Sequence, residues 1–179
     1  MYTYIVLIRG INVGGRNLIP MKELTTRLEE QGLSSVRSQG QSGNLVVQSH
    51  LSSAAQLSKL VSETIYSAKG FSANVLSLKH KDFLSILKSN PFGIADSEPK
   101  TVHVYFAIKK KLSASKQEFE HLLSNGEDLH INEKVAFLFA PKGIGRSKLA
   151  AKLETLLGVN TTARNWQSLN KTLKLIDKL

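Results

Sequence analysis

Two glycine-rich stretches hold the residues of this sequence that are best suited to bind an anion. The first, RGINVGGRN, runs from Arg9 to Asn17, and the second, GIGRSK, runs from Gly143 to Lys148. Glycine lets backbone N–H groups approach a ligand closely, and arginine offers a planar fork that fits a carboxylate or a phosphate. Each stretch leads into a predicted helix, whose N-terminus carries unpaired N–H groups. Each stretch is therefore either an anion site or a tight turn.

Neither stretch has the spacing of an established nucleotide-binding loop. The P-loop pattern G-x-x-x-x-G-K-[ST] and the dinucleotide pattern G-x-G-x-x-G are both absent from the sequence. Ser147, at the predicted start of a helix, has one side-chain oxygen, which can either cap that helix or contact an anion. The expected anion donors are the backbone N–H groups of Gly14, Gly15 and Gly145.

A third polar stretch, QSGN (Gln41–Asn44), lies at a predicted hairpin. Ser-Gly-Asn is ordinary turn material, because these residues tolerate tight backbone bends and bond their own main chain. The alternative interpretation is that the amides of Gln41 and Asn44 face a ligand near the first glycine-rich stretch.

A fourth stretch, TARNW (Thr162–Trp166), is expected to open the last helix, with Thr162 or Asn165 as its N-cap. Arg164 at a helix N-terminus would oppose the helix dipole, which indicates an anionic partner, either a ligand or a buried carboxylate. Trp166, the only tryptophan, is either a core anchor or a stacking surface for a base. The complete set of candidate ligand-binding residues is Arg9, Gly10, Asn12, Gly14, Gly15, Gln41, Ser42, Asn44, Gly145, Arg146, Ser147, Lys148, Arg164, Asn165 and Trp166.

Patterns for catalysis or metal binding are missing. The five histidines are scattered and form neither H-x-x-x-H nor H-E-x-x-H. The absence of cysteine excludes thiolate catalysis, thiolate metal sites and disulfides. No metal or cofactor is expected and no catalytic residue is assigned, although a Ser/His/Asp arrangement formed only in space stays open.

The charge balance favours acidic partners. Lys and Arg number 24 against 14 Asp and Glu, a net charge of +10. Residues 141–179 alone hold eight basic and two acidic residues. Such an excess suits nucleic acid, nucleotides or an anionic surface, and it also suits a plain basic surface. No apolar run approaches the ~18 residues of a membrane-spanning helix, and MYTYIVLIRG lacks the basic start of a signal peptide. We expect a cytoplasmic protein with no membrane segment.

The apolar pattern predicts two similar sets of elements. Predicted helices begin near Pro20, end at Gly70 and at Gly158, and include one with a capping box formed by Ser115 and Glu118. Predicted strands cover 2–8, 34–40, 44–50, 71–78, 102–108, 129–131 and 135–139.

The resulting element order is β-α-β-β-α-β-α followed by β-α-β-β-α-(β)-α. A β-α-β-β-α-β order is typical of a ferredoxin-like unit, so the sequence predicts an α+β protein with two related ferredoxin-like halves. The turn-rich segment 89–100 holds two of the four prolines and separates the halves, which are residues 1–92 and residues 93–179 with the final helix.

The motifs LIRGINVGGRNLIPMKEL, QSGN, SNPF, GRSKL and TARNW span nearly the whole chain, and in this order they resemble the bacterial domain-of-unknown-function family 1697. The resemblance implies a small cytoplasmic protein with two related α+β halves, and it implies no activity. The chain departs from the family's pattern at residues 38–40 and at 167–168. The residues that match its motifs are Arg9, Gly10, Asn12, Gly14, Gly15, Ser42, Gly43, Asn44, Arg146, Ser147, Lys148, Arg164, Asn165 and Trp166.

The leading hypothesis is a binding module for a phosphate-bearing ligand, either a nucleotide or nucleic acid. Arg9, Arg146, Lys148 and Arg164 would supply charge, while Gln41 and Asn44 would orient the ligand. An enzyme acting on a small phosphorylated or carboxylated substrate is the second hypothesis. In the third, the polar motifs are purely structural and lock the two halves together.

Overall fold

The computed structural model describes residues 1–114, 116–124 and 126–179. The chain divides into two compact units, the first formed by Met1–Ser85 and Lys171–Leu179 and the second by Ile86–Asn170. The halves predicted from the sequence, 1–92 and 93–179, differ from these units at the junction and at the C-terminus. Each unit contains one four-stranded antiparallel sheet.

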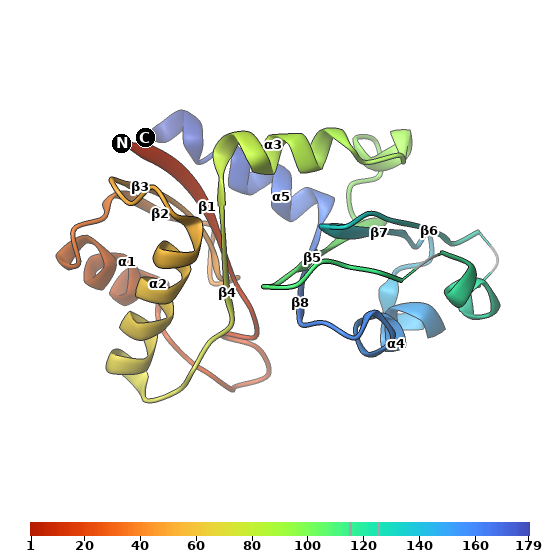
Figure 1. The fold of residues 1–179 in the computed structure, drawn as a ribbon, viewed down its shortest axis with the longest axis horizontal. Helices are drawn as coiled ribbons and strands as arrows, with labels where there is room; N and C mark the ends of the chain where they lie inside the picture. Colours follow the sequence, from red (N-terminus) through yellow and green to blue (C-terminus); the bar gives the residue numbers. More distant parts are fainter. Residues whose placement is uncertain (115, 125) are drawn as a thin grey trace. The chain divides into compact units, whose positions relative to one another are not determined.

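The first unit has the strand order β2-β3-β1-β4, with α1 and α2 covering one face of the sheet (Figure 1). Strand β1 is central and pairs antiparallel with both β3 and β4. Its sequence, YTYIVLI, is apolar on both faces because both faces are buried: Tyr4 and Val6 lie in the core under the helices, and Ile5 on the other face is also 0% exposed. The elements are β1 (Tyr2–Ile8), α1 (Met21–Glu30), β2 (Ser34–Ser38), β3 (Asn44–Ser49), α2 (Ala54–Lys69), β4 (Val75–Lys79) and α3 (His80–Lys88), which continues past the end of the unit.

The core of the first unit lies between its sheet and its two helices. Alternate residues of β1 point toward the helices, and every third or fourth residue of each helix points back. Helix α2 is defined at both ends, since the Ser53 hydroxyl accepts from the N–H of Gln56 and Gly70 ends the helix at φ +72°. The buried core side chains include Tyr4, Val6, Ile8, Leu24, Leu28, Leu57, Val61 and Ile65.

The second unit repeats this arrangement with the strand order β6-β7-β5-β8 and with α4 on one face of the sheet (Figure 1). Tyr105 and Leu138 of the sheet pack with Leu149 and Leu153 of α4. The elements are η1 (Gly93–Ala95), β5 (Val102–Ala107), η2 (Lys116–Leu122), β6 (Asp128–Ile131), β7 (Val135–Phe139), η3 (Ile144–Arg146), α4 (Lys148–Leu157), β8 (Thr161–Asn165) and α5 (Trp166–Leu173), whose last residues belong to the first unit. A last short helix, η4 (Ile176–Lys178), belongs to the first unit.

Two predicted helix starts differ from the structure. Residues 116–122 form a 3₁₀ helix rather than an α-helix, and Ser115 of the expected capping box lies outside the described residues. TARNW does not open a helix: its first four residues, 162–165, lie in strand β8, and α5 begins only at Trp166. The β-branched Thr161 and Thr162 suit a strand, and β8 completes the sheet by pairing with β5. Asn165 is nevertheless the cap, because its Oδ1 accepts from the N–H of Ser168 at 2.8 Å.

The element order β-α-β-β-α-β, with η2 in place of the first helix of the second unit, recurs in both units. The structure therefore confirms the predicted α+β class with two similar ferredoxin-like halves. In the described part of the chain, every helix is too short or too polar to cross a membrane.

Candidate functional site

The first glycine-rich stretch folds into a small exposed hairpin that we call the hairpin arm, residues 12–18. The N–H of Arg16 donates to the carbonyl of Val13 at 3.0 Å, and these two residues form an isolated β-bridge. Gly14 and Gly15 between them have φ of +57° and +73°, as a type I′ turn requires. The glycines therefore make a tight turn, and their N–H groups lie at its exposed tip.

Two asparagine side chains fix the base of the hairpin arm. The Asn12 carboxamide accepts from the N–H of Ile19 at 2.8 Å and donates to the Ile19 carbonyl at 2.9 Å and to the Gln41 carbonyl at 3.2 Å. The Asn17 amide donates to the Gly10 carbonyl at 3.0 Å. Asn12 thus connects the hairpin arm to the QSGN turn. Asn12 was a candidate ligand-binding residue, and its side chain is engaged in these bonds within the protein.

The QSGN turn closes against the end of β1. The N–H of Ile8 donates to the Gly43 carbonyl at 2.8 Å, and Gly43 has φ of +70°. A Cβ on Gly43 would lie 2.8 Å from the Ile8 carbonyl oxygen, so only glycine fits here. The next residue, Arg9, is half-buried, and its N–H donates to the Asn74 carbonyl at 2.9 Å.

The polar side chains of the same turn also have partners within the protein. Ser42 Oγ donates to the Gln39 carbonyl at 2.8 Å, and the fully buried Asn44 donates to Gln39 Oε1 at 3.0 Å. Gln41 Oε1 accepts from the N–H of Met21 at 3.3 Å, which places it at the start of α1. These contacts favour the turn interpretation of QSGN over an amide pair directed at a ligand.

The second glycine-rich stretch leads directly into α4. Gly143 has φ of +80°, the short helix η3 follows, and Ser147 caps α4 by accepting from the N–H of Ala150 at 2.9 Å. Ser147 is only 4% exposed. Of its two alternatives, cap or anion contact, the structure shows the cap.

Four exposed cations lie close to this cap in the sequence, and we call them the α4 cation cluster: Lys142, Arg146, Lys148 and Lys152. No carboxylate occurs between residues 142 and 153. Within the described residues, the backbone N–H groups of Gly145 and Lys148 donate no hydrogen bond. This segment therefore combines unused N–H donors with several exposed positive charges, the combination that favours an anion.

Arg164 does not join the α4 cation cluster. In the β5–β8 register it pairs with Val104, whereas its neighbour Asn165 pairs with His103, so Arg164 and Asn165 point to opposite faces of the sheet. The face of Asn165 is the one that also bears Tyr105 and is covered by α4. Arg164 Nη1 donates to Thr162 Oγ1 at 2.9 Å and to the Ala163 carbonyl at 2.7 Å.

Burial lowers the pKa of the Arg164 guanidinium to about 10, so this half-buried side chain still carries its charge near neutral pH. The placement of Arg164 is that of a strand residue that bonds its own strand. It is not the helix-start residue that TARNW suggested.

Trp166 is 7% exposed, and its Nε1 donates to Asp96 Oδ1 at 3.0 Å. The following residue, Gln167, donates its backbone N–H to the Pro99 carbonyl at 2.9 Å. The tryptophan therefore fastens the start of α5 to the segment before β5. These contacts favour the core-anchor interpretation, because a ring this buried offers little surface to a base.

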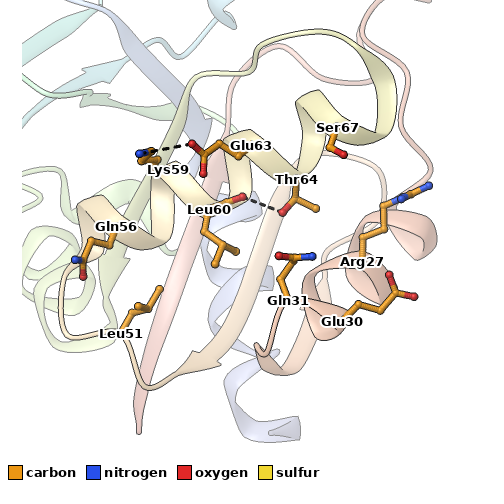
Figure 2. Close-up of a pocket in the computed structure, with 10 residues that line it drawn as sticks. All are labelled: Arg27, Glu30, Gln31, Leu51, Gln56, Lys59, Leu60, Glu63, Thr64 and Ser67. Carbon is orange, nitrogen blue, oxygen red and sulfur yellow. Dashed lines mark hydrogen bonds and ion pairs between the residues drawn. The ribbon is translucent and has the colours of Figure 1, made fainter.

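A groove that was not expected from the sequence runs between α1 and α2, with a volume of about 520 Å³ (Figure 2). Its lining has two cations, Arg27 and Lys59, and two carboxylates, Glu30 and Glu63. Arg27 pairs with Glu23 at 3.1 Å and Lys59 with Glu63 at 3.6 Å. This balanced lining does not select an anion. The sequence does not predict this groove, because its lining residues follow the usual pattern of solvent-facing positions on amphipathic helices.

No group of three or more His, Asp or Glu side chains is arranged to hold a metal ion in the part of the chain that the structure describes. Burial also lowers the pKa of His103, which faces α4 from the central strand β5. His103 therefore favours its neutral form.

Comparison with known proteins shows the family to which this chain belongs. The family described as "Protein of unknown function (DUF1697)" matches residues 1–137, about three quarters of the chain. This chain belongs to the DUF1697 family. The match includes RGINVGGRN, QSGN and SNPF, and it ends before GRSKL and TARNW.

A solved structure supports the fold of this DUF1697 member over nearly its whole length. The conserved bacterial protein SP0830 from Streptococcus pneumoniae is similar to it with a TM-score of 0.70 and 26% sequence identity, over 98% of both chains. Comparison with proteins of curated function gives no match.

Proposed function

We propose that this protein is a binding module for a phosphate-bearing ligand and that the ligand is nucleic acid. The observation that supports the proposal is the α4 cation cluster. Residues 142–152 hold four exposed cations and the unused N–H groups of Gly145 and Lys148, with no carboxylate between residues 142 and 153. Phosphate oxygens accept from backbone N–H groups and pair with Lys and Arg, so this segment meets both needs of a phosphate.

The exposure of the cluster favours a polymer over a free nucleotide. Lys142, Arg146, Lys148 and Lys152 all lie on the outer surface, whereas a nucleotide site is a concave pocket with an apolar lining. Cations spread along a protein surface can contact successive phosphates of one nucleic-acid strand. Each such contact releases counterions from the nucleic acid. The net charge of +10 adds a long-range attraction for a polyanion.

The candidate residues of the first unit have a supporting part in this proposal. Asn12 and Gln41 hold the base of the hairpin arm and the start of α1 through hydrogen bonds within the protein. Ser42 and Asn44 hold the QSGN turn by bonding to Gln39. Arg164 and Trp166 likewise hold β8 and α5. Catalysis has no supporting observation in this arrangement, and the cytoplasmic location stays a prediction.

The double variant Arg146→Ala/Lys148→Ala tests the proposal. Fluorescence anisotropy of labelled single-stranded RNA at low salt measures the affinity. We expect binding to weaken by roughly tenfold or more, because two phosphate contacts are lost. The dependence of log K on log salt should become shallower by about 0.7 for each contact removed.

Lys110→Ala/Lys134→Ala is the matched control, since it removes two exposed lysines of the same unit and lowers the net charge equally. It should retain most of the affinity. Equal weakening of both variants would mean that net charge alone governs binding. Tight binding of a mononucleotide that resists salt would replace the proposed polymer with a pocketed ligand.

A further inference from the structure

The hairpin arm of the first unit combines a fixed base with exposed apolar side chains. Val13 is 66% exposed and Leu18 is 59% exposed. Single exposed aliphatic side chains are common on protein surfaces and need no explanation. These two, however, belong to one short projecting segment whose base is fixed by the side chains of Asn12 and Asn17. Ordering a loop costs conformational entropy, and here the ordered loop presents apolar groups to water.

The sequence that carries the hairpin arm holds only positive charge. Arg16 is exposed in the arm itself, and no carboxylate occurs before Glu23 in the sequence. The N–H groups of Gly14 and Gly15 at the tip donate no hydrogen bond within the described residues. A partner that offers both negative charge and an apolar surface would match these features of the arm.

We infer that the hairpin arm contacts single-stranded nucleic acid, with Val13 and Leu18 against base faces and Arg16 on an adjacent phosphate. The inference rests on the proposed function and adds a second contact to it. Unpaired bases expose large apolar faces between phosphates, and apolar side chains that insert at base steps are an established mode of nucleic-acid binding. An anionic membrane offers the same two properties. The arm lacks the Trp and Tyr residues that anchor proteins at a membrane surface.

The variant Val13→Ser/Leu18→Ser tests the inference by anisotropy with the same labelled RNA. We expect binding at least about tenfold weaker, because two apolar contacts are lost. The salt slope should stay unchanged, since apolar contacts release no counterions. Arg16→Ala should instead make the slope shallower by about 0.7. Tyr66→Ser, which removes another exposed apolar side chain from the same unit, serves as control and should bind like the wild type.

Three results would overturn the inference. If Val13→Ser/Leu18→Ser binds RNA like the wild type while Arg146→Ala/Lys148→Ala does not, the arm has no such contact and the proposed function stands. If the wild type binds no RNA at all, both proposals fail. If the arm variant keeps RNA binding but loses sedimentation with anionic vesicles, or loses a dimer in analytical ultracentrifugation, the arm serves another partner. Circular dichroism and the melting temperature confirm that the variants fold.

Discussion

Gly43 shows how much a single residue of the QSGN turn contributes to the stability of the first unit. Gly43 has φ of +70°, so an alanine there has a strained backbone. The alanine Cβ would also lie 2.8 Å from the Ile8 carbonyl oxygen, which is a steric overlap with the backbone. We expect a loss of roughly 2–4 kcal/mol in the free energy of unfolding of the first unit. Urea denaturation followed by far-ultraviolet circular dichroism measures it.

Gly10→Ala is the matched control, because Gly10 has a similar φ of +68° but nothing within 4 Å of a Cβ. It should cost only about 1 kcal/mol, the backbone strain alone. Equal losses in the two variants would show that the close approach to Ile8 contributes nothing.

Strand β5 gives an element-scale prediction, because His103 is buried in this central strand. Burial lowers its pKa below the ordinary value of 6.5, so the unfolded chain binds this proton more readily than the folded chain. Stability is therefore full above pH 6.5 and falls below it, by at most about 1.4 kcal/mol per pH unit, until the folded pKa is passed.

Thermal unfolding followed by Trp166 fluorescence, at pH 7.5 and at pH 5.5, measures this loss. The expectation concerns the difference between wild type and His103→Gln, since other groups titrate in both proteins. The variant should lose less stability on acidification than the wild type. An identical loss in the two proteins would contradict the assignment to His103.

Elements with a strong apolar period were predictable from the sequence. The stripes of α1, α2 and α4 and the apolar strand β1 predicted the element order, apart from the 3₁₀ helix η2 in place of an α-helix. That order predicted the ferredoxin-like halves. Strand β8 was not predictable as the setting of TARNW. Its five residues form a strand because the edge of β5 is there to pair with, which is a tertiary effect that local sequence does not encode.

The candidate site was predictable in composition but not in the role of each residue. Gly-rich segments before helices are typical of anion sites and of tight turns alike, and only the partners distinguish them. The Asn12 side chain bonds to Ile19, and the Asn44 side chain bonds to Gln39. The spacing of these residues in the sequence does not predict such bonds. The α4 cation cluster, in contrast, follows directly from four basic residues close together in the sequence.

The protein as a whole carries a net charge of +10, and we propose that it binds a phosphate polymer through the α4 cation cluster rather than through this overall charge. Overall charge attracts a polyanion from a distance, but that attraction is screened beyond a Debye length of about 10 Å at 0.1 M salt. Direct phosphate contacts persist and are counted by the salt dependence of binding.

The most direct measurement is the affinity of the wild type for single-stranded RNA across a series of salt concentrations. Four contacts from the α4 cation cluster, at about −0.7 each, predict a slope near −2.8 in a plot of log K against log salt, with any Arg16 contact adding to it. In Arg146→Ala/Lys148→Ala the slope should become about half as steep if the cluster alone makes contact. No binding at the lowest salt, or the same slope in both proteins, would contradict the claim.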